Sequence, residues 1–382
     1  MSAKKKILSV VGARPNFMKL APIIKELNRH KKTFTHRVVH TGQHYDYSLS
    51  KVFFRDMDMP KPDIYLGIGS ASHSEQTAAI MTAFEKVVLN EKPDLVILFG
   101  DINSTIACSL VCSKILYKNG GTIPVAHVES GLRSFDRTMP EEINRIVTDS
   151  LAEILFVTEK IGVTNLLNEG IERKKIHLVG DTMIDALVQF RGKFRGSKIL
   201  KSLGLAPRKY ALVTIHRPVN VDNMKTLGKL ISILEKVSAL AMEFDPSFML
   251  VFPVHPRTMK MINSFGFTGR VAAIENLLVE EPAGYTDFIK LLTDSRFVMT
   301  DSGGIQEEAT FLRIPCLTLR DSFERAETLE LGTNTLCSLK QKLVLVKVTE
   351  IFRGKYKKGR IPKLMDGKAS SRIVKILLKN LK

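Results

Sequence analysis

A chain of 382 residues, of which 44% are hydrophobic and 25% charged, has the composition of a globular protein and is long enough for two domains. Its apolar runs are shorter than a membrane-spanning helix or the core of a secretory signal requires, so we expect a cytoplasmic protein without membrane contact. The formal net charge of +18 suggests a nucleic-acid-binding protein, but residues 340–382 alone carry 14 Lys and Arg against two acidic residues, and a docked helix with a basic exposed face explains that excess better.

The four cysteines predict neither a disulfide framework nor a metal site. Cys108 and Cys112 are four residues apart and share one helix face, but no further ligands are spaced for zinc. We expect all four, including Cys316 and Cys337, to be small buried side chains. A zinc site is therefore not expected.

The first half of the chain alternates short apolar runs with amphipathic segments. The apolar runs predict strands at residues 6–12, 36–42, 94–100, 123–129 and 153–158. The amphipathic segments predict helices such as those at residues 16–30 and 102–118. Strands that alternate with helices form βαβ units, and uninterrupted apolar runs are typical of a parallel sheet covered on both faces. We therefore predict a Rossmann-like, doubly wound α/β domain over residues 1–188.

The pattern weakens in a basic, glycine-containing stretch from about Gln189 to Lys209, and we expect a linker near Gln189. It then restarts and predicts strands at residues 210–217, 248–255, 270–275, 296–301 and 314–319. These strands would form a second Rossmann-like domain over residues 189–365, followed by a helix at residues 366–382. Two such parallel sheets would enclose a cleft lined by the carboxyl ends of their strands, where ligands bind in this type of sheet.

Charged residues follow two of the expected strands in the first domain. After the first strand, Gly12 permits a tight turn, and the next helix N-terminus can hold an anion within reach of Arg14 and Lys19. After the strand at 94–100 comes Asp101, which either serves chemistry or only caps the following helix.

Residues 128–145, VESGLRSFDRTMPEEINR, concentrate charge after the strand at 123–129. Glu129 ends the strand, while Glu141 and Glu142 begin the next helix, where negative charge also suits the helix dipole. Arg133 and Arg145 would pair with Glu141 or Glu142 and set their ionisation. Carboxylates gathered at one sheet edge indicate a pocket that moves protons, and we expect Asp101, Glu129 and Glu141 to be exposed to the cleft.

The strand ends of the second domain carry His216, His255 and a Ser-Gly-Gly turn at residues 302–304. The turn is either an ordinary tight turn or a diphosphate cradle, because its backbone N–H groups open a helix without side chains in the way. Glu308, one helical turn later, is placed to accept hydrogen bonds from ribose hydroxyls. The pattern predicts that the second domain holds a nucleoside diphosphate and that the first brings carboxylates to the attached sugar.

The ordered set of these segments resembles the non-hydrolysing UDP-N-acetylglucosamine 2-epimerases. The resemblance covers nearly the whole chain, and its blocks are GARPNFMK, TGQHYD, GDINST, HVESGLRS, MPEEINR, GDTMIDAL, TIHRP, PVHPR, TDSGGIQEEA and RDSFERAE. It implies the GT-B fold of two Rossmann-like domains, in which the C-terminal helix crosses back to the first domain. It also implies a homodimer that interconverts UDP-N-acetylglucosamine (UDP-GlcNAc) and UDP-N-acetylmannosamine (UDP-ManNAc) for polysaccharide biosynthesis.

The resemblance assigns roles to individual residues by matching motif. The implied catalytic residues are Asp101, Glu129, Glu141 and His216. The implied UDP-sugar ligands are Arg14 and Lys19 at the nucleotide, Ser302, Gly303 and Gly304 at the diphosphate, Glu308 at the ribose, Arg325 near the phosphates and Phe288 beside the uracil.

Two departures from the family pattern concern regulation and the uracil contact. Many bacterial members read HRREN where this chain reads HRPVN at residues 216–220, so a cation and a carboxylate are missing. Some members are activated by a second UDP-GlcNAc bound in this region, and here only Gln43 and His255 are candidate regulatory residues. Ala283 replaces a glutamine of some members five residues before Phe288, a change that a backbone contact would survive.

The chemistry explains why several acid/base groups are needed. The hydrogen on C2 is not beside a carbonyl carbon, so the anomeric C–O bond must break first, with the charge of the leaving UDP met by backbone amides and cations. A carboxylate then removes the C2 proton and leaves 2-acetamidoglucal. Re-addition of UDP, with a proton delivered to the other face of C2, gives the epimer. Two faces require at least two acid/base groups, and the sequence does not assign a face to each carboxylate. The reaction requires no metal or redox cofactor, so we expect none.

Three other functions compete with this interpretation. A 2-epimerase of UDP-2,3-diacetamido-2,3-dideoxy-glucuronic acid is the nearest, and its uronate would need an extra cation near the sugar, which several arginines could supply. A GT-B glycosyltransferase would need an acceptor surface, and three carboxylates on one sugar argue against it. A nucleic-acid-binding protein would show a strongly salt-dependent affinity that survives a change of Glu129.

Overall fold

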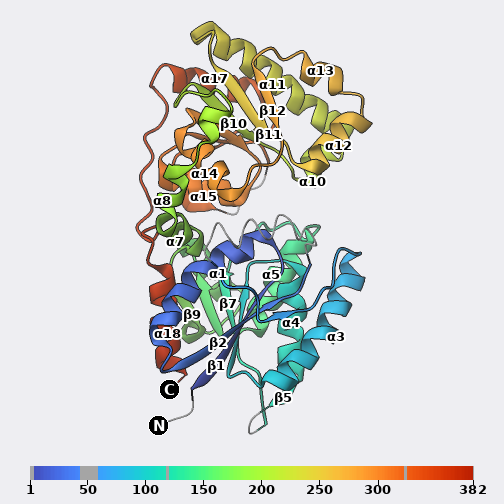
Figure 1. Ribbon diagram of the computed structural model, residues 1–382, viewed down its shortest axis with the longest axis vertical. Coiled ribbons are helices and arrows are strands. Elements are labelled where there is room, and N and C mark those ends of the chain that lie inside the picture. The colour runs from blue at the N-terminus through green and yellow to red at the C-terminus, as the bar shows by residue number, and fades with distance from the viewer. Residues whose placement is uncertain (1–3, 44–58, 118–119, 322–324, 382) are drawn as a thin grey trace. The chain divides into compact units, whose positions relative to one another are not determined.

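The computed structural model describes residues 4–43, 59–117, 120–321 and 325–381, which fall into two compact units (Figure 1). The first unit is made of Met1–Phe190 together with Lys363–Lys382, and the second is Arg191–Pro362. Each unit has its own parallel sheet and its own hydrophobic core. The predicted fold class, two Rossmann-like parallel-sheet domains, is confirmed.

The first unit is built on a seven-stranded parallel sheet with the order β3-β2-β1-β4-β7-β8-β9. Its strands are β1 (Lys5–Val11), β2 (Phe34–His40), β3 (Ile64–Tyr65), β4 (Leu95–Phe99), β7 (Val125–Ser130), β8 (Ile154–Val157) and β9 (Ile176–Leu178). A separate antiparallel hairpin joins β5 (Leu116–Tyr117) to β6 (Gly121–Thr122). The chain reverses its direction across the sheet at β1 and β4, which places the switch point, the usual ligand position, at the ends of these central strands.

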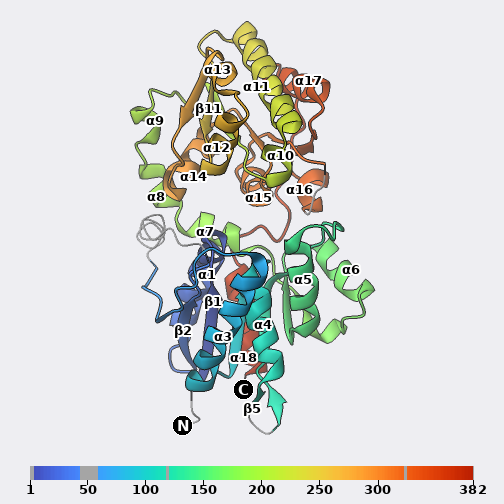
Figure 2. The ribbon, with the colours of Figure 1, turned by 90° about the vertical axis from the view of Figure 1, so that its right-hand side faces the viewer.

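Helices cover both faces of this sheet, which is why β4, with the sequence LVILF, is buried at every position. Figure 1 shows α1 and α18 on one face and α3 and α4 on the other, and Figure 2, turned by 90°, places α3 and α4 in front of the sheet. The helices are α1 (Arg14–Leu27), α3 (His73–Glu91), α4 (Asn103–Lys114), α5 (Pro140–Leu151), α6 (Lys160–Asn168), α7 (Thr182–Gln189) and α18 (Ala369–Asn380).

The basic C-terminal segment forms α18, which packs on α1 and α7 of the first unit. Ile373, Val374 and Leu377 are buried, whereas the lysines of the helix face outward. The carboxylate of Asp185 in α7 accepts hydrogen bonds from the first backbone N–H groups of α18, including that of Ser370 at 2.6 Å. The alternation of apolar and basic residues in this helix therefore serves docking on the protein itself.

The second unit has a six-stranded parallel sheet with the order β12-β11-β10-β13-β14-β15. Its strands are β10 (Tyr210–Thr214), β11 (Met249–Pro253), β12 (Leu277–Glu280), β13 (Phe297–Thr300), β14 (Cys316–Thr318) and β15 (Asn334–Leu336). This is the Rossmann strand order, with its switch point at β10 and β13.

Helices also cover both faces of the second sheet. They are α8 (Arg191–Gly196), α9 (Ile199–Ser202), α10 (Pro218–Val221), α11 (Met224–Phe244), α12 (Pro256–Ser264), α13 (Thr268–Ala272), α14 (Tyr285–Asp294), α15 (Gly303–Leu312), α16 (Ala326–Glu330) and α17 (Gln341–Phe352). Figure 1 shows α11 and α12 on one side and α14 and α15 on the other. Successive residues of β10 reflect this: the Tyr210 hydroxyl donates to the Leu291 carbonyl of α14, whereas Ala211 packs in the cluster that includes α11.

The structure corrects one of the predicted elements. The run at residues 270–275 is not a strand, because it overlaps α13, and the strand lies a few residues later in β12. The basic stretch after Phe190, where the pattern weakens, contains the short helices α8 and α9 and buries Phe194 and Leu200. The four cysteines are buried free thiols. None of the helices in the described ranges is both long and apolar enough to cross a membrane.

Candidate functional site

In the first unit, Glu129 lies at the end of β7 in a strained backbone conformation. Its φ angle is +74°, which is uncommon for a residue with a side chain, and the register of β7 against β8 shifts between Val128 and Ser130. Bulges of this kind re-aim a side chain beside functional sites. The backbone strain therefore marks Glu129 as a residue whose direction is set by the fold.

The carboxylate of Glu129 forms an ion pair with Lys19 of α1, and both side chains are almost fully buried. Gly100, which follows β4 with a φ of +62°, makes room for this pair. A Cβ atom at Gly100 would come within 2.9 Å of the Lys19 Nζ atom and 3.2 Å of the Glu129 Oε2 atom. The expectation that all three carboxylates are exposed is therefore wrong for Glu129.

Arg145 of α5 joins Asp101, after β4, to Glu142 in the first turn of its own helix. Its Nη2 atom lies 2.6 Å from the Asp101 Oδ2 atom, and its Nη1 atom lies 3.0 Å from the Glu142 Oε2 atom. The Asp101 side chain remains 29% exposed. Asp101 does not cap α4, because the N-cap residue is Ile102. The geometry leaves Asp101 an accessible carboxylate beside a buried guanidinium.

The adjacent glutamates of α5 have opposite environments. Glu142 is buried, and its carboxylate accepts hydrogen bonds from the backbone N–H groups of Ser134 and Phe135, each at 2.9 Å. Glu141 is half-buried, and no described residue hydrogen-bonds to its carboxylate. Glu142 thus anchors the loop that precedes α5, whereas Glu141 is available to a ligand.

A buried His127–Asp149 pair supports this edge of the sheet. The two ring nitrogens of His127 face Asp149 at 2.6 Å and the Gly100 carbonyl at 2.7 Å. Burial raises the pKa of Asp149, but His127, Arg133 and the N–H of Gly131 outweigh it and hold that pKa below its usual value. Arg133 pairs with Asp149 and Glu169. The prediction that Arg133 pairs with Glu141 or Glu142 is therefore wrong.

In the second unit, His216 and Asp301 meet across the switch point between β10 and β13. The Nδ1 atom of His216 lies 3.2 Å from the Asp301 Oδ1 atom. The carboxylate of Asp301 also accepts the backbone N–H of Arg217 at 2.9 Å. Asp301 is fully buried, whereas the His216 side chain is 40% exposed.

The Ser-Gly-Gly turn forms the N-terminus of α15, with Ser302 as its N-cap residue in an extended conformation. The Ser302 side chain makes no capping hydrogen bond. A Cβ atom built at Gly304 would meet no atom within 4 Å. The first turn of α15 therefore presents backbone donors beside open space, as an anion site requires.

Three other predicted ligands of the nucleotide lie in the second unit. Glu308 is buried in α15 and accepts a hydrogen bond from the Tyr285 hydroxyl at 2.8 Å. Arg325 is buried at the N-cap of α16 and lies 3.2 Å from the Glu307 carboxylate. Phe288 is half-buried in α14.

The remaining predicted site residues belong to two separate groups. Gln43, in the first unit, is buried and its Oε1 atom accepts hydrogen bonds from the N–H and the hydroxyl of Ser104 at 2.9 and 2.7 Å. His255, in the second unit, caps α12, and its ring centroid lies 5.8 Å from that of His216. Arg14 begins α1, but its side chain lies outside the described part, as do residues 44–46 and 322–324 of two family blocks.

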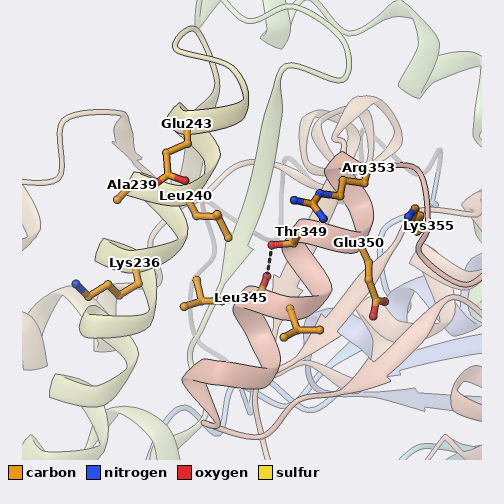
Figure 3. Close-up of a pocket in the computed structure, with 10 residues that line it drawn as sticks. Lys236, Ala239, Leu240, Glu243, Leu345, Thr349, Glu350, Arg353 and Lys355 are labelled. Carbon is orange, nitrogen blue, oxygen red and sulfur yellow. Dashed lines mark hydrogen bonds between the residues drawn. The ribbon is translucent and has the colours of Figure 1, made fainter.

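A hollow on the second unit lies away from all of these residues, against α11 and α17 (Figure 3). Its lining mixes the apolar Leu240, Leu345 and Val346 with lysine, arginine and glutamate side chains. The hollow contains none of the residues at the strand ends, and neither positive nor negative charge dominates its lining. We therefore do not assign it as the binding site of the nucleotide or the sugar.

Sequence reasoning missed the partners that fix the site residues. Lys19 was expected at the nucleotide, but in the structure it pairs with Glu129. Asp301, the last residue of the strand predicted at 296–301, is not among the predicted site residues, although it contacts His216 directly. The Rossmann strand order was the available signal, because it places the ends of β10 and β13 side by side.

Comparison with known proteins identifies the family. The family model described as UDP-N-acetylglucosamine 2-epimerase matches residues 25–378. The chain is 40% identical over 375 residues to the UDP-N-acetylglucosamine 2-epimerase of Methanocaldococcus jannaschii, covering 97% of this chain and 98% of the relative. It is 38% identical over 377 residues to the UDP-2,3-diacetamido-2,3-dideoxy-D-glucuronate 2-epimerase of Pseudomonas aeruginosa, covering 98% and 99%.

The structural comparison agrees. The crystal structure of the Methanocaldococcus jannaschii UDP-GlcNAc 2-epimerase in complex with UDP-GlcNAc and UDP matches with a TM-score of 0.86 and 38% identity, over 98% of this chain and all of that one. The match confirms the predicted GT-B-type fold. The chain belongs to the UDP-N-acetylglucosamine 2-epimerase family.

Proposed function

We propose that this protein interconverts UDP-GlcNAc and UDP-ManNAc by epimerisation at C2. The observation that carries the proposal is that β4, β7 and α5 bring Asp101, Glu129 and Glu141 to one edge of the first sheet. The family membership and the UDP-GlcNAc bound to a relative support the substrate class.

The proposed reaction is an elimination followed by an addition. The C1–O bond breaks with its electron pair going to UDP, a carboxylate removes the C2 proton, and the electrons of that C–H bond form the C1–C2 double bond of 2-acetamidoglucal. A second group then returns a proton to the opposite face of C2 while UDP oxygen bonds to C1. Asp101, Glu129, Glu141 and His216 are the proposed acid/base set.

The nucleotide is assigned to the second unit. The backbone N–H groups at the start of α15 would bind the diphosphate, with Glu308 at the ribose, Phe288 beside the uracil and Arg325 near the phosphates. Arg14 and Lys19 would contribute from the first unit, and Lys19 would then serve both the nucleotide and Glu129. Gln43 and His255 stay candidate regulatory residues.

The second candidate substrate is a UDP-2,3-diacetamido-2,3-dideoxy-glucuronate, which one relative's name suggests. Its uronate needs a cation near the sugar. Arg133 and Arg145 follow Glu129 and Glu141 in the sequence, but they are already bound by Asp149 and Glu169 and by Asp101 and Glu142, respectively. Because both guanidinium groups already bind carboxylates of the protein, UDP-GlcNAc is favoured over the uronate as the substrate.

Solvent exchange tests the proposed reaction. Incubation of UDP-GlcNAc with the protein in D₂O should place deuterium at C2 of both epimers, which NMR or mass spectrometry detects. The diacetamido-glucuronate substrate should exchange more slowly under the same conditions. Formation of UDP-ManNAc with full retention of the original C2 hydrogen would exclude the elimination mechanism.

The Gly304→Ala variant should bind UDP about tenfold more weakly, because hydrogen bonds to a charged group contribute about 1.5–3 kcal/mol. A Cβ atom in a helix points toward the N-terminus, here toward the proposed anion. The protein itself has room for it, so the melting temperature should not fall. Calorimetric titration with UDP measures the effect.

Gly269→Ala is the matched control for that variant. Gly269 is also helical, and a Cβ atom at this position would also meet no atom within 4 Å, but the residue lies in α13. It should leave the UDP affinity unchanged. Equal UDP affinities for the two variants would show that the diphosphate does not bind at the start of α15. The homodimer, the cytoplasmic location and the role in polysaccharide biosynthesis stay predictions from the sequence.

A further inference from the structure

Asp301 divides its hydrogen bonds between its two carboxylate oxygens. The Oδ2 atom accepts the backbone N–H of Arg217 at 2.9 Å, the side-chain amide of Asn220 at 3.0 Å and the backbone N–H of His216 at 3.1 Å. The Oδ1 atom faces the Nδ1 atom of His216 at 3.2 Å and lies equally far from the His216 backbone nitrogen. One oxygen thus fixes the backbone after β10, and the other contacts the imidazole ring.

The charge state of Asp301 determines which ring nitrogen of His216 carries a proton. Burial raises the pKa of Asp301, but the hydrogen bond and charge of His216 and the donors from Arg217 and Asn220 bring it below the usual value. An ionised carboxylate only accepts hydrogen bonds, so the Nδ1 atom must be the donor. The lone pair of the neutral ring is then on Nε2, which no described residue hydrogen-bonds.

We propose that Asp301 is a positioning residue that holds His216 with Nδ1 protonated, so that Nε2 is the ring atom presented to the UDP-sugar. This inference rests on the proposed function, in which His216 belongs to the acid/base set. A neutral Nε2 atom can accept a proton or a hydrogen bond from the substrate, whereas the opposite tautomer offers a donor there.

The His127–Asp149 pair of the first unit shows what a purely structural arrangement of the same residue types looks like. His127 is completely buried, and both of its ring nitrogens face acceptors, a carboxylate and a carbonyl oxygen. His216 instead has one committed nitrogen and a ring that is open to solvent. His127 and His216 therefore differ in exposure and in the number of ring nitrogens that face a partner. These differences distinguish a histidine that stabilises the fold from one that is oriented toward a ligand.

The Asp301→Asn variant isolates this role. The asparagine oxygen can occupy the Oδ2 position and keep the hydrogen bonds from Arg217 and Asn220. Its NH₂ group then faces Nδ1 of His216 and donates to it, so the ring proton moves to Nε2. Because the shape and the hydrogen bonds to the Oδ2 position survive, including that from the His216 backbone N–H, the tautomer is the main change.

The test combines ring ¹⁵N NMR with kinetics. With ¹⁵N-histidine labelling, and a His216→Gln variant to assign the signal, wild-type protein should show the neutral His216 ring protonated on Nδ1, and Asp301→Asn should show it protonated on Nε2. The variant should lose about 10²-fold or more in kcat, with KM for UDP-GlcNAc changed less than about threefold. In a His216→Gln background, Asp301→Asn should cause little further loss, because a residue that acts through His216 has no effect without it.

Asn220→Ala is the control for a structural effect. It removes one donor from Oδ2 but not the contact between Oδ1 and Nδ1, so it should lower the melting temperature while the His216 tautomer stays the same. An unchanged tautomer in Asp301→Asn, wild-type kcat in that variant, or fully additive losses in the double variant would each overturn the inference. If Asp301→Asn does not fold, a wild-type His216 protonated on Nε2 overturns it. Wild-type protein without C2 exchange contradicts the proposed function instead, and the NMR comparison still decides the tautomer.

Discussion

Replacing Glu129 with glutamine is expected to lower turnover by about 10²-fold or more, the usual scale for a positioned acid or base. The amide has nearly the same shape but cannot take up the C2 proton. The backbone of Glu129 is held at a positive φ within a bulge, and the Lys19 ion pair fixes its carboxylate. Because these restraints hold the Glu129 carboxylate in one position, we expect that neither water nor another acidic side chain can take over its role.

The same substitution should also cost stability, because the carboxylate is buried against a buried ammonium. Loss of a charged partner in such a place costs about 3–5 kcal/mol in the general case, and the amide oxygen of glutamine, which still accepts one hydrogen bond, should hold the cost to the lower end of that range. Removing both charges in a Glu129→Gln, Lys19→Met double variant should restore part of the melting temperature. It should restore none of the turnover.

The double variant therefore separates fold from chemistry. Turnover per folded protein, melting temperature and C2 exchange in D₂O are measured for wild type, the single variants and the double variant. If the double variant regained activity together with stability, Glu129 would be a structural residue, and its charge would serve only to neutralise Lys19.

The placement of the site residues was predictable, but their partners were not. Asp101 and Glu129 follow apolar runs of the first unit, and His216 and the turn at residues 302–304 follow apolar runs of the second. Within each parallel sheet the ends of such runs lie at one edge. The pairing of Lys19 with Glu129 joins residues 110 positions apart. It depends on the order of the strands and on a glycine that leaves space, neither of which a local pattern contains.

The errors in the predicted elements have a similar origin. A short apolar run such as RVAAIE fits a strand and a buried helical turn equally well, and here the helical turn α13 occupies its first half. The positive φ of Glu129 is equally invisible in sequence, because the bulge arises from its register against β8. Such features depend on tertiary contacts, which override local propensity.

The second large loss of turnover is expected at Glu141. Its neighbour Glu142 offers a direct comparison between a proposed acid/base residue and a residue that stabilises the fold. Glu141→Gln is expected to reduce turnover by about 10²-fold or more, while its stability should change by less than about 0.5 kcal/mol, as for a surface substitution. The reason is its environment: Glu141 is half-buried at the start of α5, and no described residue hydrogen-bonds to its carboxylate.

Glu142→Gln should instead lower the stability of the protein more than its turnover. Its buried carboxylate accepts two backbone N–H groups and lies 3.0 Å from Arg145, and an amide satisfies only part of these donors, at a cost of about 1–3 kcal/mol. Its turnover per folded molecule should fall much less than that of Glu141→Gln, because Arg145 retains its contact with Asp101. Melting curves and initial rates for the two variants, prepared side by side, give the comparison. Equal turnover losses in both would mean that α5 supports the site only as a scaffold, and a Glu141→Gln protein with wild-type turnover would remove Glu141 from the acid/base set.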